Sequence, residues 1–521
     1  MMSEQYEKWV PPHGFKWIYA SLLISMLLAA LDQTIISTAL PTMVGELNGV
    51  SSMSWVITAY ILTSTISMPV YGKLGDLLGR RSMMLTALTI FVAASGLGGF
   101  SQNIEQLIFY RALQGLGGGG LMVLTQATMA DLVPIRERSK YMAPIGMMFA
   151  LASIAGPLIG GFLTDYMSWR WTFWVKIPIG LLVIGICWKG LHLRVPDVDF
   201  RLDLMGILSM SVAVSSLTLF LGWGGTTYAW NSILISGLGF LTICSSVLFL
   251  WAESRARDPI IPLSLFKNRT FNICTALGLL IGVGMFASIS YLPTYLQMVY
   301  GYSAIVSGYL MIPMIIGIMV AVNVSGLLVA RQGHYKKYPV IGISMCTLAL
   351  YLFSTLSAGQ SVVLVCLYIC LLGAGVGCFI QILILAVQNS VPFEEVGTAT
   401  SANSFFREIG ATMGIAVVGA LFSARLTVML AERVPAASDL PIENVESITP
   451  AILRMLPDDL QEIFINAYAD ALTPIFLYLI PIFIGGIILA CFLPNMKLEQ
   501  KIPELPAEEE ITEEAAEVIV S

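Results

Sequence analysis

The chain has 521 residues, of which 57% are hydrophobic and only 12% are charged. Soluble domains carry about 25% charged residues, so this composition excludes a soluble enzyme, a nucleic-acid-binding protein and a disordered scaffold. The formal net charge of −6 arises in the last segment, where two Lys stand against eight Glu between Lys497 and Ser521. We therefore expect residues 494–521 to form an acidic, disordered tail.

Fourteen apolar runs along the chain are long enough to cross a bilayer, which takes about 20 apolar residues in a helix. They are 17–39, 53–72, 82–100, 106–130, 141–163, 169–189, 204–223, 231–251, 271–297, 305–329, 338–357, 361–388, 399–424 and 473–493. The first run has no small-residue cleavage site before Asp32, so we interpret it as a retained span and not a signal peptide.

The positions of Lys and Arg predict the orientation of these spans. With the N-terminus inside, the inner segments hold 20 of the 27 basic residues. The outer segments hold Arg170, Arg425, Arg433 and Arg454. Because cytoplasmic loops are enriched in Lys and Arg, we expect an even number of spans, both termini in the cytoplasm, and a multi-pass protein of the cell membrane.

The two halves of the chain resemble each other. GKLGDLLGRR at 72–81 matches GLLVARQGHY at 326–335, LQGLGGGG at 113–120 matches LLGAGVGC at 371–378, and the offset is nearly constant. Such repeats are typical of secondary transporters, whose substrate site lies near the membrane midplane between the halves. The sequence thus predicts an all-α protein with a 6+2+6 arrangement.

The predicted segments are a cytoplasmic N-terminus (1–16), a first six-helix bundle (17–190), two inserted helices (204–251), a second six-helix bundle (271–493) and the tail (494–521). Within the second bundle, 425–472 is predicted to be a long extracellular loop. It contains stretches that look locally helical, and it is either a lid or a plain connection.

Five ionisable residues lie well inside predicted spans: Asp32, Arg111, Lys176, Arg407 and Glu408. A charge near the bilayer centre costs at least about 2.5–3.5 kcal/mol, so such groups face the protein interior and have partners. At 1.5 Å per residue, the first three all lie about 8–10 Å below the outer surface. We expect them to meet, either as a proton- or substrate-coupling site or as a fixed ion pair. Lys176 can also snorkel outward.

Arg407 and Glu408 lie about 12–14 Å from the inner surface, close to the midplane. Neighbouring residues on a helix point about 100° apart, so the two need not pair. Phe405 and Phe406 precede them, and aromatic rings beside an acid suit a flat, hydrophobic cation. The alternative is an inter-helix ion pair with aromatic packing. Gln114 and Gln388 are further candidates for the substrate cavity.

Two glycine-containing segments are expected to be conformational elements. The segment with Gly156, Pro157, Gly160 and Gly161 allows close helix contact in lipid and serves as a packing site or a gating hinge. In the inner loop at 72–81, the glycines permit a tight turn, Asp76 can cap a helix end, and the arginines stay on the cytoplasmic side. The loop residues concerned are Gly72, Asp76, Arg80 and Arg81.

The sequence offers no candidate for metal or cofactor chemistry. All eight Cys lie in apolar stretches without a CxxC pair, and the three His are far apart, so no metal-ligand spacing is present. There is no plausible nucleophile–base set and no GxxxxGK[ST] loop for ATP. We therefore expect no cofactor, no metal and no enzymatic activity.

Several motifs together resemble those of the major facilitator superfamily, in its fourteen-helix drug:proton antiporter branch (EmrB/QacA type). The inner loop resembles GxLaDrxGrrk, residues 111–117 resemble RxxqGxg, 156–161 matches GPxxGG, and 31–41 is similar to LDxTIvnvALP. WRWTFWVKIPIG at 169–180 is similar to WRWiFxiNxPiG of the branch, except that Lys176 replaces the usual Asn. The resemblance implies alternating access, export driven by the proton gradient, and Asp32 and Glu408 as coupling candidates.

The expected function is export of amphipathic, drug-like compounds in exchange for protons, as in multidrug efflux and antibiotic resistance. We expect a monomer in the lipid bilayer that binds a small-molecule substrate and protons and no nucleic acid. Lys176 adds a positive charge beside Asp32, which weakens cation binding there. A dedicated exporter of an endogenous metabolite or lipid is the alternative, followed by a membrane receptor that does not transport.

Overall fold

The computed structural model describes residues 14–47, 52–191, 201–225, 228–357, 359–433 and 457–495, together with residues 11, 49, 193 and 453. These residues are almost entirely helical, and fourteen of their helical segments are long and apolar enough to cross a membrane. The predicted all-α fold with fourteen spans is therefore confirmed. Nearly all of the predicted N-terminal segment and acidic tail lie outside the described residues.

The first bundle contains six spans: α1 (Phe15–Glu46), α2 (Met53–Leu78), α3 (Arg80–Gly98), α4 (Ile104–Leu132), α5 (Ile135–Tyr166), and α6 (Trp171–Trp174) continued by α7 (Lys176–Gly190). α1 packs on α5, α2 on α4, and α3 on both α4 and α7. Asn103 caps α4 by accepting a hydrogen bond from the Gln106 amide. Gly79 separates α2 from α3 at φ 87°, a backbone conformation that favours glycine.

The two inserted helices, α8 (Leu204–Trp223) and α9 (Ile233–Arg255), form a hairpin beside the bundles. α8 begins after Asp203, whose side chain accepts a hydrogen bond from the Gly206 amide. α8 also contacts α2 and α15, one helix of each bundle. Large apolar side chains such as Phe240 remain exposed on this hairpin, as expected for a surface in contact with lipid.

The second bundle follows the short helix η2 (Leu263–Lys267). It contains α10 (Arg269–Val299), α11 (Ala304–Tyr309), α12 (Ile312–Gln332), α13 (Lys337–Ser354), α14 (Val362–Gln388), η3 (Phe393–Glu395), α15 (Val396–Arg433) and α17 (Asp458–Cys491). α10 packs on α15, α12 on α14, and α13 on both α14 and α17. Helices at corresponding places in the two halves therefore form the same pairs, which is the 6+2+6 arrangement.

The outer connection of the second bundle is shorter than the sequence predicts. Residues 425–433 continue α15, and 458–472 form the first turns of α17. Arg425 and Arg433 on α15 donate hydrogen bonds to Asp470 on α17, and Arg425 also bonds the Ala471 carbonyl. The charged residues lower the hydropathy of 425–472, which is why the sequence predicts a loop there. In the structure they form hydrogen bonds between α15 and α17. Residues 434–452 lie outside the described residues.

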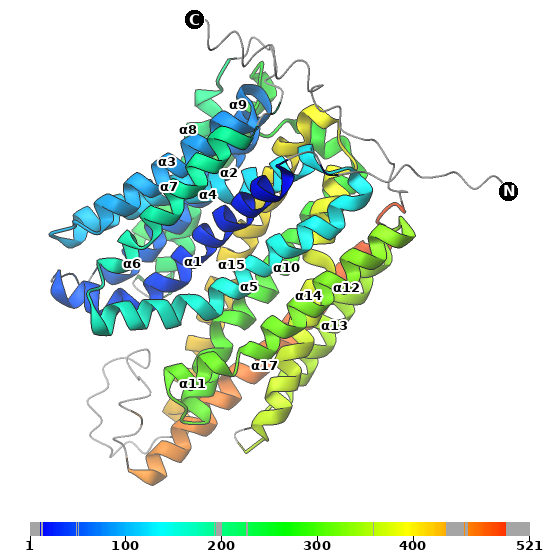
Figure 1. The fold of residues 1–521 in the computed structure, drawn as a ribbon. Coiled ribbons are helices and arrows are strands. Elements are labelled where there is room, and N and C mark those ends of the chain that lie inside the picture. Colours follow the sequence, from blue (N-terminus) through cyan, green and yellow to red (C-terminus); the bar gives the residue numbers. More distant parts are fainter. Residues whose placement is uncertain are drawn as a thin grey trace, which may run out of the picture.

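The two bundles approach each other at the side where α1 begins and α17 ends, and they diverge toward the opposite side (Figure 1). We call the first side the inner side, since the basic residues predict that it faces the cytoplasm. There α2 packs on α15, and α5 packs on α12. A methyl group added at Gly72 of α2 would collide with the Ser401 side chain of α15, so glycine is needed for this close approach.

Candidate functional site

Asp32 of α1 is the centre of a buried charge cluster in the first bundle. Its carboxylate accepts hydrogen bonds from Arg111 of α4 and Lys176 of α7, and it forms ion pairs with both. Gln114 donates a third hydrogen bond over 2.9 Å. The exposed fraction of the three charged residues is 1% or less. The structure thus brings together four side chains that the sequence singled out, from three helices.

The two cations of this cluster also have aromatic and backbone partners. Arg111 donates to the Val56 carbonyl (3.2 Å) and to Gln114 Oε1 (2.8 Å), and its guanidinium lies 4.3 Å from the Tyr60 ring centroid. Lys176 Nζ lies 4.8 Å from the Phe173 ring centroid. With one carboxylate and two cationic side chains, the fully ionised cluster carries one positive charge. Such a cluster holds α1, α4 and α7 together.

Glu408 and Arg407 of α15 form a much looser pair. Their closest charged atoms are 3.9 Å apart, and their side chains are 22% and 13% exposed. Glu408 follows Ser401 by seven residues, so both lie on nearly the same face of α15, about 10 Å apart along its axis. Ser401 meets Gly72 of α2. Glu408 therefore points toward the first bundle, just outward of the close contact between the bundles.

The aromatic residues next to this pair pack elsewhere. Phe405 is buried, and its ring lies 5.4 Å from that of Phe406. Phe406 in turn makes an edge contact with Phe266 of η2. The two rings thus make edge-to-face contacts that lead to η2 at the start of the second bundle, and Glu408 is not part of this aromatic cluster. Their predicted contact with substrate stays a prediction.

Asp76 links the bundles at the inner side. Its carboxylate accepts hydrogen bonds from the amides of Gly397 (3.1 Å) and Thr398 (2.6 Å) and from the Thr398 hydroxyl (2.6 Å) at the start of α15. Arg80 forms ion pairs with Asp76 and, at 2.9 Å, with Asp131. We call this group the inner clasp. Arg81 instead donates to the Trp188 carbonyl within its own bundle.

A second set of contacts extends the inner clasp, and the sequence did not single out most of it. Arg138 of α5 is buried and donates to Gln388 of α14 (3.3 Å), which donates to Thr400 of α15 (3.1 Å). Ser139 donates to the Gly326 carbonyl of α12 over 2.9 Å. Gln388 is thus buried between the bundles in this conformation. The sequence could not predict that Arg138 lies between the bundles, because it is one of many basic residues in the inner segments.

The GPxxGG segment lies on the face of α5 that meets α1. A methyl group at Gly156 would collide with Thr34, and one at Gly160 would collide with Thr38 and the Ile35 carbonyl. Gly161 has no atom of another residue near the corresponding position. The Thr34 hydroxyl donates to the Ala152 carbonyl over 2.8 Å. Gly156 and Gly160 therefore permit close packing next to the helix that carries Asp32, and Pro157 is exposed.

Among the residues that the structure describes, no group of three or more His, Cys, Asp or Glu side chains is placed so that it could hold a metal ion.

The family model of the Major Facilitator Superfamily matches residues 22–415. An uncharacterised MFS-type transporter of Mycobacterium tuberculosis is 39% identical over 92% of this chain and 70% of its own length. The multidrug transporter protein MdtP of Bacillus subtilis is 36% identical over 96% of this chain and 97% of its own. The human organic anion transporter MFSD10 has the same fold, with a TM-score of 0.63 at 15% identity, covering 92% of this chain and all of that one.

The match to the family model extends over most of both bundles and includes Asp32, Arg111, Lys176 and Glu408. The resemblance in the sequence motifs is thereby confirmed, as are the predicted fold, the location in the cell membrane and the absence of an enzymatic function. This chain belongs to the major facilitator superfamily and is a multi-pass membrane transporter.

Proposed function

We propose that this transporter exports amphipathic, drug-like compounds in exchange for protons. One feature supports the proposal: Glu408 has a partly exposed side chain, and within the described residues its counter-ion contact is the 3.9 Å one to Arg407. Its spacing from Ser401 places it on the face of α15 that meets the first bundle. A carboxylate in such a place binds either a proton or a cationic substrate at little cost in broken contacts. The relative MdtP, a multidrug transporter, supports a drug-like substrate.

The arrangement of the bundles suits alternating access. In this conformation the inner clasp joins the bundles at the inner side, and the outer ends diverge (Figure 1). Protons arriving from outside neutralise Glu408, which removes the attraction for a bound cation and releases the substrate outward. Opening of the inner clasp then exposes Glu408 to the cytoplasm, where it loses the proton and binds the next substrate.

Asp32 has a different place in this cycle. It is fully buried, and both oxygens of its carboxylate are occupied by donors. A proton can reach it only when α1, α4 and α7 move apart. We propose that Asp32 couples protonation to the packing of the first bundle, whereas Glu408 meets the substrate.

A dedicated exporter of an endogenous metabolite or lipid is the second candidate, and Lys176 favours it. With Lys176 and Arg111 the cluster contains two cations for one carboxylate. This excess positive charge repels a cationic drug and attracts an anionic or zwitterionic compound.

Ethidium efflux from inside-out vesicles or energised cells tests the proposal. We expect efflux that a protonophore abolishes, and loss of efflux in both Asp32→Asn and Glu408→Gln. Arg81→Gln is the matched control, because within the described residues the hydrogen bond of Arg81 is to Trp188 of its own bundle. Absence of efflux in a folded, well-expressed protein would favour the dedicated exporter. Efflux that persists in the presence of protonophore would contradict proton coupling.

A further inference from the structure

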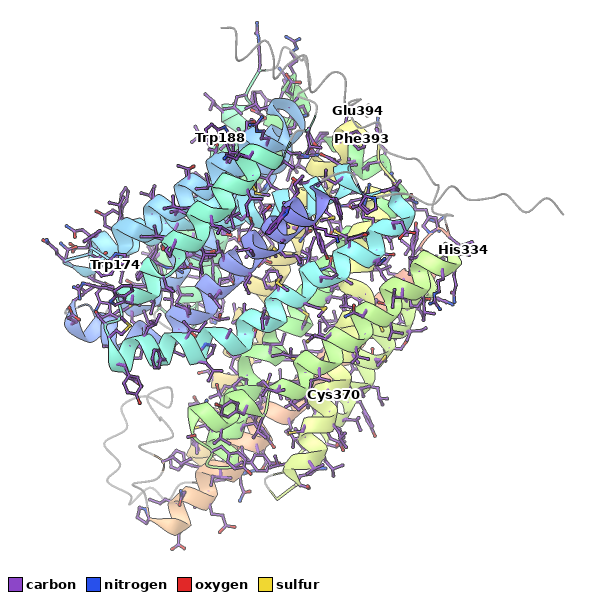
Figure 2. The ribbon with its side chains drawn as sticks, in the orientation of Figure 1. Trp174, Trp188, His334, Cys370, Phe393 and Glu394 are labelled. Carbon is purple, nitrogen blue, oxygen red and sulfur yellow. The ribbon has the colours of Figure 1, made fainter. Side chains whose placement is uncertain are left out.

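A cavity of about 670 Å³ lies at the inner end of the second bundle, between the end of α12, the start of α13 and the end of α17. Figure 2 labels His334 at this end of the bundle. The polar part of its lining includes His334, Lys336 and Lys337. Its apolar part includes Val340, Ile341 and Cys491. We call this cavity the basic groove.

The basic side chains of the groove form no ion pair within the described residues. His334, Lys336 and Lys337 have no carboxylate partner there, and the Lys337 ammonium lies 5.2 Å from the Tyr338 ring centroid. The corresponding loop of the first bundle differs. There, Arg80 occupies the position equivalent to His334 and is held by Asp76 and Asp131. The second copy has Ala330 at the position of Asp76, so its positive charge remains available to a ligand.

The apolar part of the groove lies at the membrane surface. Val340 and Ile341 follow Lys337 by three and four residues, so they lie about 5–6 Å deeper along α13. Ile341 is 47% exposed, and Phe492, next to Cys491, is 58% exposed. A cationic rim and an apolar floor one helical turn apart match the boundary between the headgroup and the acyl chains of a phospholipid.

We propose that the basic groove binds the phosphate headgroup of an anionic phospholipid of the inner leaflet. The two lysines bind the phosphate, and Ile341 and Cys491 contact the upper part of the acyl chains. A free phosphate ion would bind the two lysines of the rim but would leave Ile341 and Cys491 of the apolar floor exposed. The acidic tail follows Asn495 at the edge of the groove, so its glutamates are the competing occupant that the test below distinguishes from a lipid.

The test uses the full-length protein in a neutral detergent and measures occupancy of the groove by the rate at which Cys491 is alkylated. This exposed thiol is alkylated with N-ethylmaleimide, and exposed Cys244 on α9 is the internal control. We expect dioleoyl phosphatidylglycerol to slow alkylation of Cys491 at least about threefold without affecting Cys244, and dioleoyl phosphatidylcholine or inorganic phosphate to have no such effect. Lys336→Gln with Lys337→Gln should weaken binding of phosphatidylglycerol by about 25-fold, since each surface cation contributes roughly fivefold.

The control for this double variant is Lys189→Gln with Lys267→Gln, which removes the same charge from exposed inner positions outside the groove. Equal protection by phosphatidylcholine, or equal loss of binding in the two double variants, would overturn the proposal. Protection by inorganic phosphate alone would assign the groove to a free anion. Protection of Cys491 without lipid that disappears in Glu508→Gln/Glu509→Gln/Glu510→Gln would assign it to the acidic tail. Either of these last two results also overturns the lipid site.

Discussion

The buried cluster around Asp32 and the pair of Arg407 and Glu408 solve the same problem in different ways. Both place charges inside the membrane, where an isolated charge is costly. Asp32 has three side-chain donors and no exposed surface, whereas Glu408 has one distant counter-ion and a side chain that is 22% exposed. From this difference we expect Asp32, whose carboxylate is saturated with donors, to hold the bundle together, and Glu408, which is not, to be the carboxylate that can take up a ligand or a proton.

The largest effect is expected when the buried charge cluster around Asp32 is disrupted. Asp32→Asn leaves Arg111 and Lys176 as two uncompensated cations in a buried site, which should destabilise the protein by about 3–5 kcal/mol. Thermal unfolding of the purified protein measures this. The double variant Asp32→Asn/Lys176→Asn removes one of the stranded cations, so it should be more stable than the single variant. Equal stability of Asp32→Asn and the wild type would show that the cluster does not hold the bundle.

The next effect concerns the inner clasp, which in the proposed cycle controls the side from which Glu408 is reached. Asp76→Asn removes a charged acceptor shared by Gly397, Thr398 and Arg80. Hydrogen bonds to charged groups contribute about 1.5–3 kcal/mol each, so the inner side should open more often. We expect maleimide labelling of Ser401→Cys from the inner side to rise by about tenfold. Arg81→Gln, in the same loop, should leave the labelling rate unchanged.

A smaller effect tests the packing next to Asp32. Gly156→Ala places a methyl group against Thr34, two residues beyond Asp32 on α1, and overpacking of this kind costs about 1–3 kcal/mol. Gly161→Ala is the matched control, because that position has space for a methyl group. The melting temperature should fall only in Gly156→Ala. If both variants melted alike, close contact of α1 and α5 would not depend on Gly156.

The smallest effect on stability is expected at Glu408. Glu408→Gln removes a charge that has only a 3.9 Å contact and a partly exposed side chain, so stability should change by less than about 1 kcal/mol. The same thermal unfolding assay measures it beside Asp32→Asn. A loss as large as that of Asp32→Asn would place Glu408 among the residues that hold the fold together.

Much of this architecture could be predicted from the sequence, since apolar length and the positions of Lys and Arg determine spans and orientation. The depths of Asp32, Arg111 and Lys176 also predicted their meeting, because charges inside the membrane need partners. The inner clasp could not be predicted in the same way. Asp76 meets Thr398 across 322 positions of the chain, and this contact depends on which side of the transporter is closed.

Two further features were hidden for identifiable reasons. Residues 458–472 carry several acids and so lie outside the predicted apolar run, although parts of them look locally helical. They form the first turns of α17, where Arg425 and Arg433 donate hydrogen bonds to Asp470. Gln388 is a polar residue at the end of an apolar run, which favours a cavity position. The structure instead places it beside Arg138, an inner basic residue that the sequence does not distinguish from its neighbours.

Proton release on substrate binding tests proton-coupled export through Glu408 most directly. Purified protein in a weakly buffered detergent solution is mixed with ethidium, and a pH indicator records the protons released. Exchange at Glu408 predicts release from the wild type and from Arg81→Gln, and no release from Glu408→Gln at ethidium concentrations that saturate the variant. Equal proton release from Glu408→Gln and the wild type would contradict the assignment of Glu408 as the group at which proton and substrate compete.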